Sequence, residues 1–193
     1  MISGVKYLTW APVTGGGSGS AVTYGTGTAE TDKMVHVDMS EDRNDDGFNA
    51  DDHRIDHDNS INSASIALEV ARLSSAMKKG ILGHAEGTSD EMHVTDAPSP
   101  FVGVGFVVRD RYKGADTFRG YWYYKVQFSE GQRAWDTRGE NINYQTESLE
   151  GDAEAVQLAS GGEFTYYSYK ELTGTGAETS AYSYVKTHAG ISG

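Results

Sequence analysis

The sequence predicts a mostly β protein, an antiparallel β-sandwich or barrel with one short α-helix packed on it. Three observations lead to this fold class. Glycine is abundant at 24 residues while proline is scarce at 3, and Tyr, Thr and Ser recur in short alternating stretches, which is typical of strands. Two long segments alternate apolar and polar residues with period two. Only one segment shows a clear helical period.

The two alternating segments predict a hairpin. The first places on one face Val102, Val104, Phe106 and Val108. The second runs from Thr117 to Ser129 and places on one face Phe118, Gly120, Trp122, Tyr124, Val126 and Phe128. The sequence YKGA at residues 112–115 between them supplies the turn. We therefore expect two long antiparallel strands, each half buried.

The remaining elements are shorter. Further strands are predicted over Val5–Trp10, Met34–Met39, Ser63–Val70, Asn141–Ser148, Val156–Ala159 and Phe164–Tyr169. The helical period is carried by Leu73, Ala76, Met77 and Ile81, with Gly83 as a stop. A second helix is compatible with residues 178–187. The glycine-rich segment 14–21 is predicted to be a loop, and the 193 residues to form one domain.

The most unusual segment is acidic and reads DMSEDRNDDGFNADDHRIDHD, from Asp38 to Asp58. Its nine acidic residues against Arg43 and Arg54 leave seven net negative charges, out of a total of −12 for the chain. The segment has little to bury, so we expect an exposed loop between two strands. A surface this acidic repels phosphate, which argues against a sequence-reading nucleic-acid binder.

Part of the acidic segment resembles a calcium-binding loop. Asp42, Asn44 and Asp46 occupy the first, third and fifth positions of an EF-hand loop, and Gly47 the sixth. The twelfth position holds His53 instead of the bidentate Glu, and no helices are predicted on either side. The pattern therefore favours a solvated acidic loop, with weak calcium binding as the alternative.

Other chemistry is less well supported. His53 and His57 have the i, i+4 spacing of a zinc site, but the HExxH pattern is absent, and a surface pair of histidines is the favoured interpretation. The sequence contains no GxSxG elbow, P-loop or dinucleotide-binding glycine pattern. We expect neither catalysis nor a cofactor. There is no cysteine, which excludes disulfides, and no apolar run approaches the roughly 18 residues of a membrane helix, so we expect no membrane insertion.

Several segments in order resemble the major tail tube proteins of siphophages. They read GVKYLTWAPVT, NADDH, SIALEVARLSSAMKKGILGH, PFVGVGFVVRD, GYWYYKVQFSE and TRGENINYQTESLEG. The resemblance covers residues 4–152, and the strand-forming GYWYYKVQFSE together with TRGENINYQTESLEG is its most specific part. Residues 153–193 have no counterpart in it, although their aromatic residues predict at least one ordered strand.

The resemblance implies a structural virion protein with the β-sandwich of the tail tube type. Six copies would form a ring, and rings would stack into a conduit for genome ejection, which implies double-stranded DNA as non-specific cargo. Implied partners are further copies of the chain and other tail proteins, such as the tape measure and the tail terminator. The protein would be made in the host cytoplasm and reside in the virion tail. An acidic lining would keep the duplex off the wall.

These expectations assign roles to named residues. The acidic segment becomes an assembly arm with possible lumen acids at Asp42, Asp45, Asp46, Asp51, Asp52 and Asp56. Candidate contacts between subunits are Arg43, Arg54, Leu73, Met77, Tyr121 and Tyr123. Two alternatives remain open: a calcium-dependent β-sandwich module that binds carbohydrate or protein through its aromatic residues, and a metal-dependent hydrolase centred on His53 and His57.

Overall fold

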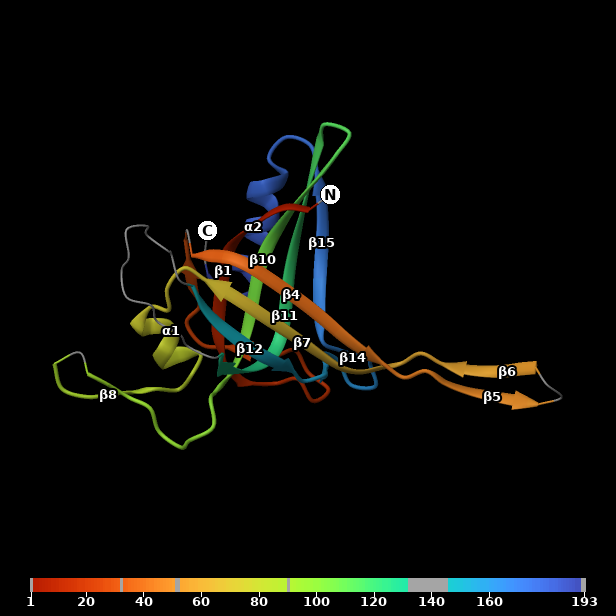
Figure 1. Cartoon of the computed structure of the whole chain (residues 1–193), viewed down its shortest axis with the longest axis horizontal. Coiled ribbons are helices and arrows are strands. Elements are labelled where there is room, and N and C mark those ends of the chain that lie inside the picture. The colour runs from red at the N-terminus through yellow and green to blue at the C-terminus, as the bar shows by residue number, and fades with distance from the viewer. Residues whose placement is uncertain (1, 32, 51–52, 90, 132–145, 192–193) are drawn as a thin grey trace, which may run out of the picture.

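A computed structural model of the chain describes residues 2–31, 33–50, 53–89, 91–131 and 146–191, and only the backbone for residues 2–3, 46–50 and 53–58 (Figure 1). The elements are β1 (Ile2–Gly15), β2 (Thr23–Tyr24), β3 (Thr28–Glu30), β4 (Met34–Arg43), β5 (Asp46–Ala50), β6 (His53–Asp58), β7 (Ile61–Val70), α1 (Ser75–Gly80), β8 (Ala85–Glu86), β9 (Met92–His93), β10 (Phe101–Tyr112), β11 (Ala115–Glu130), β12 (Glu147–Ala153), β13 (Val156–Gln157), β14 (Phe164–Thr165), β15 (Tyr167–Thr173) and α2 (Ala177–His188).

Nine strands form one antiparallel sheet in the order β2-β1-β10-β11-β12-β7-β4, with β3 also pairing β1 and β15 also pairing β11. The sheet folds over, so that β7 and β4 cross in front of β10 and β11 (Figure 1). The strand β4 is the last on its side, and the described strands do not close into a barrel. The predicted mostly β, antiparallel fold is therefore confirmed, whereas closure is not found.

The predicted hairpin is β10 and β11. Tyr112 pairs with Ala115 across a two-residue turn, in which Lys113 and Gly114 have φ values of 49° and 85°. Positive φ at both central residues is the geometry of a type I′ turn, whose twist matches that of the strands it joins. The turn therefore fixes the register of the longest pair of strands in the sheet.

A β-bulge interrupts the alternation of β11. Val102 pairs with Val126, but Val104 pairs with Tyr123, so two residues of β11 stand opposite the single Gly103. The bulge moves later side chains to the other face: Trp122 packs in one core cluster and Phe128 in the other. The single continuous face predicted from Phe118 to Phe128 is therefore wrong. A period-two pattern does not show where an inserted residue exchanges the two faces of a strand.

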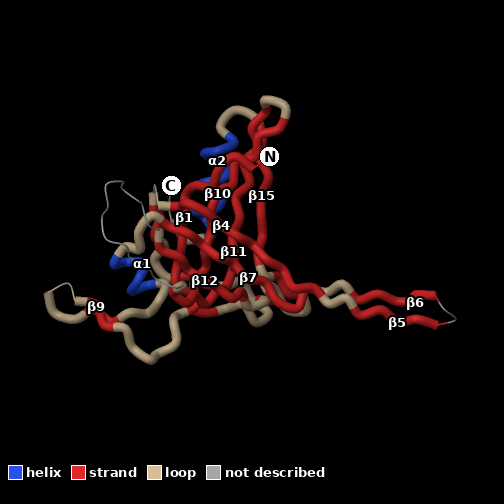
Figure 2. Tube along the Cα trace, in the orientation of Figure 1, coloured by secondary structure: helices blue, strands red, loops and turns tan. Residues whose placement is uncertain are grey.

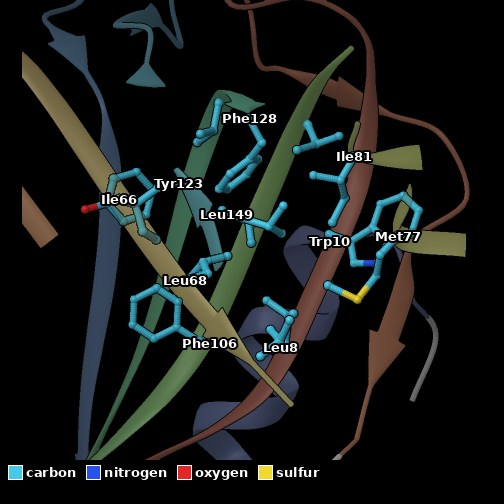
Figure 3. Packing of buried hydrophobic residues seen from close by; sticks show 14 of the residues in the cluster. Leu8, Trp10, Ile66, Leu68, Met77, Ile81, Phe106, Tyr123, Phe128 and Leu149 are labelled. Carbon is cyan, nitrogen blue, oxygen red and sulfur yellow. The ribbon is translucent and has the colours of Figure 1, made fainter. Parts of the chain in front are cut away.

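The larger core lies between the hairpin and the strands that cross it (Figure 3). The residues labelled there all have at most 5% of their surface exposed and are Leu8, Trp10, Ile66, Leu68, Met77, Ile81, Phe106, Tyr123, Phe128 and Leu149. Each such side chain stabilises the fold by roughly 1.5 to 3 kcal/mol through burial. The short helix α1 closes one end of this core, with Ser74 as its N-cap, accepting a hydrogen bond from the Met77 amide at 3.2 Å.

The second core lies on the opposite face of the hairpin, under α2. The helix buries Ala177, Ala181 and Val185 against the sheet, and its C-cap residue Ala189 is buried with them. A Cβ added at Gly120 would lie 2.8 Å from the Ala181 carbonyl oxygen, so this glycine allows the close approach of helix and sheet. The structure thus has two packed helices and not one, and the segment 178–187, which the sequence gives as compatible with helix, lies inside α2.

The other predicted strands agree in part with the structure. The strand expected over Val5–Trp10 lies inside the longer β1, and the one over Ser63–Val70 lies inside β7. Of the strand predicted over Asn141–Ser148, residues 141–145 lie outside the described residues, and β12 begins at Glu147. Beyond residue 153, β15 extends the sheet and α2 covers one of its faces.

Candidate assembly surface

The acidic segment forms a projecting hairpin. The ribbon of β4 and β7 continues through the Asn44 amide, which donates a hydrogen bond to the Ser60 carbonyl at 2.8 Å, into the paired strands β5 and β6. We call the two strands β5 and β6, residues 46–50 and 53–58, the arm. It extends away from the body (Figures 1 and 2). The predicted position between two strands is confirmed, but the segment is largely strand and not loop.

The root of the arm is held by a cluster of hydrogen bonds centred on Glu41. One oxygen of its carboxylate accepts a hydrogen bond from the Tyr167 hydroxyl. The other accepts from Arg43, at 2.6 Å from Nη2 and 3.1 Å from Nε. The bond from Tyr167 and the guanidinium of Arg43 together lower the pKa of the Glu41 carboxyl. We call Glu41, Arg43 and Tyr167 the root clasp.

The root clasp connects the arm to the core of the body. The Tyr167 ring stacks on the buried Tyr123 ring with centroids 4.9 Å apart. Arg43 Nη1 donates to the Asn59 carbonyl at 3.4 Å, between β6 and β7, and the Tyr166 hydroxyl donates to the Asn62 carbonyl in β7 at 3.0 Å. The direction in which the arm leaves the body is therefore fixed by side chains of the β14–β15 region.

A groove opens where β4 crosses the hairpin. The register places Val37 opposite Leu68 and Met39 opposite Ile66, so the inner face of β4 continues the core face of β7. Even so, 48% of Val35 and 37% of Met39 are exposed. The groove has a volume of about 580 Å³ and also contacts β1, β10 and β11, with the lining residues Gly4, Val5, Val35, His36, Val37, Asp38, Met39, Val108, Arg119 and Tyr121.

Three of the predicted contacts between subunits are instead core residues. Leu73 is 2% exposed, and Met77 and Tyr123 are fully buried, so none of them can touch a neighbour in this conformation. The helical period of Leu73 and Met77 is confirmed, but the surface that they pack against belongs to the same chain. The alternation places Tyr123 on the face opposite Phe128, whereas the bulge brings both residues into the same core. Tyr121 is half buried and lines the groove, which leaves it as a candidate.

The structure describes the side chains of only some of the charged residues that were predicted to act in assembly. Asp42 and Asp45 are exposed at the root of the arm. Arg43 is also exposed, but it binds Glu41 of its own chain. The side chains of the others lie outside the described residues: Asp46, Asp51, Asp52, Arg54 and Asp56.

The metal hypotheses remain predictions. Among the described side chains, no group of three or more His, Asp or Glu residues is placed to hold a metal ion. The side chains of Asp46, His53 and His57, on which the calcium and zinc hypotheses depend, lie outside that set.

A second group of linked side chains lies at the start of α2, and sequence patterns did not predict it. We call it the second clasp. Glu178 accepts hydrogen bonds from Lys6 Nζ at 3.0 Å and from the Tyr7 hydroxyl at 2.9 Å. The Tyr7 ring stacks on Tyr182 with centroids 4.3 Å apart. These residues are about 170 positions apart in the chain, so no local pattern joins them. The only signal is Glu178 in the first turn of a helix, where a negative charge is favourable.

Comparison with models of known protein families finds no match, and comparison with curated protein sequences finds none either. Among the described residues, no helix has the length and apolar character needed to cross a membrane.

Proposed function

We propose that the chain is a structural virion protein that self-assembles into hexameric rings, stacked as the tube of a long non-contractile phage tail. The observation that carries the proposal is the arm. Its two strands pair with each other and leave the body (Figure 2). A two-stranded ribbon in water is marginally stable by itself, so a neighbour that receives it would supply the missing contacts.

The edge of the sheet supports the same proposal. The strand β4 ends the described sheet, and beside its edge lies the groove with exposed Val35 and Met39. An open strand edge with apolar side chains is an aggregation site unless another chain covers it. In a ring, a second copy of the protein would pair one of its strands with the edge of β4 and cover the groove. The exposed edge would then be an assembly contact and not an aggregation site.

The net charge supports a conduit for DNA. A chain with −12 charges repels the phosphate backbone at short range, because the field is screened beyond roughly 8 to 10 Å at physiological salt. A duplex would then pass through the bore without being held, since cations that neutralise phosphates are what make proteins bind DNA.

Negative-stain electron microscopy of the purified protein tests the proposal. We expect rings, or tubes with a bore wide enough for a DNA duplex, at high protein concentration. A chain that stays monomeric at high concentration, and after seeding with preformed aggregates of the same protein, would exclude the proposed function.

A further inference from the structure

Charge is distributed unevenly over two projecting parts of the molecule. Residues 46–58, which comprise the arm and the two residues between its strands, contain five aspartates against Arg54, which gives four net negative charges. The end of the β10–β11 hairpin, residues 109–119, has the opposite balance and is called here the basic tip. Its four cations are Arg109, Arg111, Lys113 and Arg119; its two anions are Asp110 and Asp116. It therefore has a net charge of +2 in a chain of −12.

The ion pairs of the basic tip leave its outermost cations at the surface. Arg109 holds Asp116 at 2.6 Å, and Arg119 binds Asp110 at 3.5 Å and Glu171 at 2.7 Å. Arg111 lies farther from Asp116, at 3.8 Å, with 60% of its side chain exposed. The positive charge that remains is thus presented at the end of the hairpin.

An aromatic residue accompanies these cations. Tyr112 is 67% exposed, and the Lys113 ammonium lies 5.2 Å from the centre of its ring. The type I′ turn at Lys113 and Gly114 holds the three side chains of residues 111–113 on a tight connection. Exposed tyrosine and arginine side chains are the residue types that most often dominate the energy of protein interfaces.

The arm and the basic tip of one copy do not meet. The tip lies at the top of the body in Figure 1, whereas the arm runs out to the right. The arm strands pair with each other, and the described contacts at its root are made to β14 and β15, not to the tip. Attraction between the two is therefore available only between different copies.

We propose that the acidic arm of one copy binds the basic tip of a second copy. This inference rests on the proposed function, because it identifies the surface that receives the arm. The two surfaces differ, so the contact is head to tail, and such contacts generate closed rings or continuing filaments instead of a closed pair. Complementary charge speeds association and suppresses wrong registers, and it makes assembly sensitive to salt.

Charge reversal on each surface gives a direct experiment. One variant reverses the tip, with Arg111→Glu and Lys113→Glu. A second reverses the arm, with Asp46→Lys, Asp56→Lys and Asp58→Lys on its two paired strands, which changes the net charge of residues 46–58 from −4 to +2. A control matched to the tip variant, Arg72→Glu with Lys79→Glu, makes the same change in net charge as that variant on exposed residues near α1. Light scattering and sedimentation velocity of the full chain follow assembly, and circular dichroism with thermal melting checks that each variant is folded.

Each reversed variant alone should associate at least about tenfold more slowly than wild type at low ionic strength, since like charges then face each other. An equimolar mixture of the two should assemble again, because the acidic tip of one meets the basic arm of the other and the remaining wild-type arm meets the wild-type tip. The control should assemble like wild type. Wild-type assembly should weaken between about 50 and 500 mM salt, as screening shortens.

Three results would overturn the inference: a tip variant that assembles as fast as wild type, folded variants whose mixture stays unassembled, or a control that loses assembly as strongly as the tip variant. Binding of a fluorescent DNA duplex to wild type but not to the tip variant would assign the tip to nucleic acid instead.

Failure of the proposed function gives different results from failure of this contact. Salt-sensitive open filaments that respond to the reversals without forming rings would keep the contact and exclude the tube. Tubes whose assembly is unchanged by the reversals would keep the tube and exclude the contact.

Discussion

The two faces of the β10–β11 hairpin are covered to different extents. On one face, α2 buries Ala177, Ala181 and Val185 in one cluster with Trp122 and Phe118, and the start of the helix is held by Glu178. On the other face, the crossing strands β7 and β4 form the main core, but the cover opens at β4 into the groove. Both faces belong to the same strands, so strand propensity does not account for the difference.

The difference shows where the chain itself provides the cover and where it does not. The α2 face uses small helix residues and glycines in the sheet to bring backbone close to backbone. The groove is lined by β-branched and long side chains that remain about half exposed, Val35 and Met39. Changes on the α2 face should therefore reduce the stability of the subunit, and changes in the groove should affect its association.

The largest effect on stability is expected for Trp122→Ala. Trp122 is fully buried under α2, and its Nε1 donates to the Tyr24 hydroxyl at 3.0 Å. Its removal leaves a cavity and a lost hydrogen bond, and should lower the free energy of unfolding by about 3 to 5 kcal/mol. Urea unfolding of the unassembled subunit, followed by fluorescence or circular dichroism, measures this change.

The matched variant on the other face is Tyr121→Ala. Tyr121 neighbours Trp122 in the chain but lines the groove, where it stacks on Phe106 and Tyr169. Its truncation should destabilise the subunit by less than half as much. Equal losses for the two variants would show that the groove face contributes as much to the fold as the α2 face, contrary to the comparison.

A smaller effect is expected for Gly105→Ala. A Cβ at this position would lie 2.6 Å from Val185 Cγ1 and from Trp122 Cε3, and 2.7 Å from the Tyr121 carbonyl oxygen. Overpacking of this kind costs about 1 to 3 kcal/mol. The control is Gly4→Ala, where the added Cβ meets nothing within 4 Å. Its effect should stay within about 0.5 kcal/mol, and a control as damaging as Gly105→Ala would contradict the close packing of α2.

The root clasp should make the stability of the subunit depend on acid. Hydrogen bonds from Tyr167 and Arg43 lower the pKa of Glu41 in the folded state below its ordinary value of 4.5. A carboxyl with a lowered folded pKa stabilises the fold at pH values above its unfolded pKa, and that contribution is lost as the pH falls through the folded pKa. The expected window therefore lies below about pH 4.5.

Glu41→Gln isolates this contribution. The variant should be less stable than wild type at neutral pH by about 0.5 to 1 kcal/mol, a modest value because the clasp is partly exposed to solvent. The difference should disappear in urea unfolding at pH values well below 4.5. Glu178→Gln provides the comparison on the α2 side, because bonds from Lys6 and Tyr7 also lower the pKa of that carboxyl. A Glu41→Gln deficit that is independent of pH would exclude the clasp.

The sequence predicted the elements whose signals are local. The β10–β11 hairpin is fixed by period-two alternation and by turn residues at its end, and α1 by the spacing of Leu73, Met77 and Ile81. The close packing at Gly103 and Gly105 also has a local signal, since glycine within a strand indicates the close approach of a neighbouring group. These features depend on residues near each other in the chain.

Features that depend on distant residues were not predictable. The bulge in β11 depends on how Gly103 meets its partners, and the two clasps join residues more than 120 positions apart. For the same reason, alternation placed Tyr123 on the face opposite Phe128, and it could not show that the bulge brings Tyr123 into the core of its own chain. The charge of the acidic segment predicted its position better than alternation predicted that of Tyr123. A segment with many charges and few apolar residues has to lie outside the core, whatever the rest of the fold.

The smallest effect on subunit stability is expected in the groove. Val35→Thr with Met39→Gln replaces two exposed apolar side chains by polar ones of similar size, so the unfolding free energy of the isolated subunit should change by no more than about 0.5 kcal/mol. Assembly should respond more strongly, since a second copy that covers the groove would have to desolvate the new polar groups. Sedimentation velocity beside urea unfolding separates the two quantities. A variant that unfolds earlier but assembles normally would mean that the groove belongs to the subunit core and that another surface joins the copies.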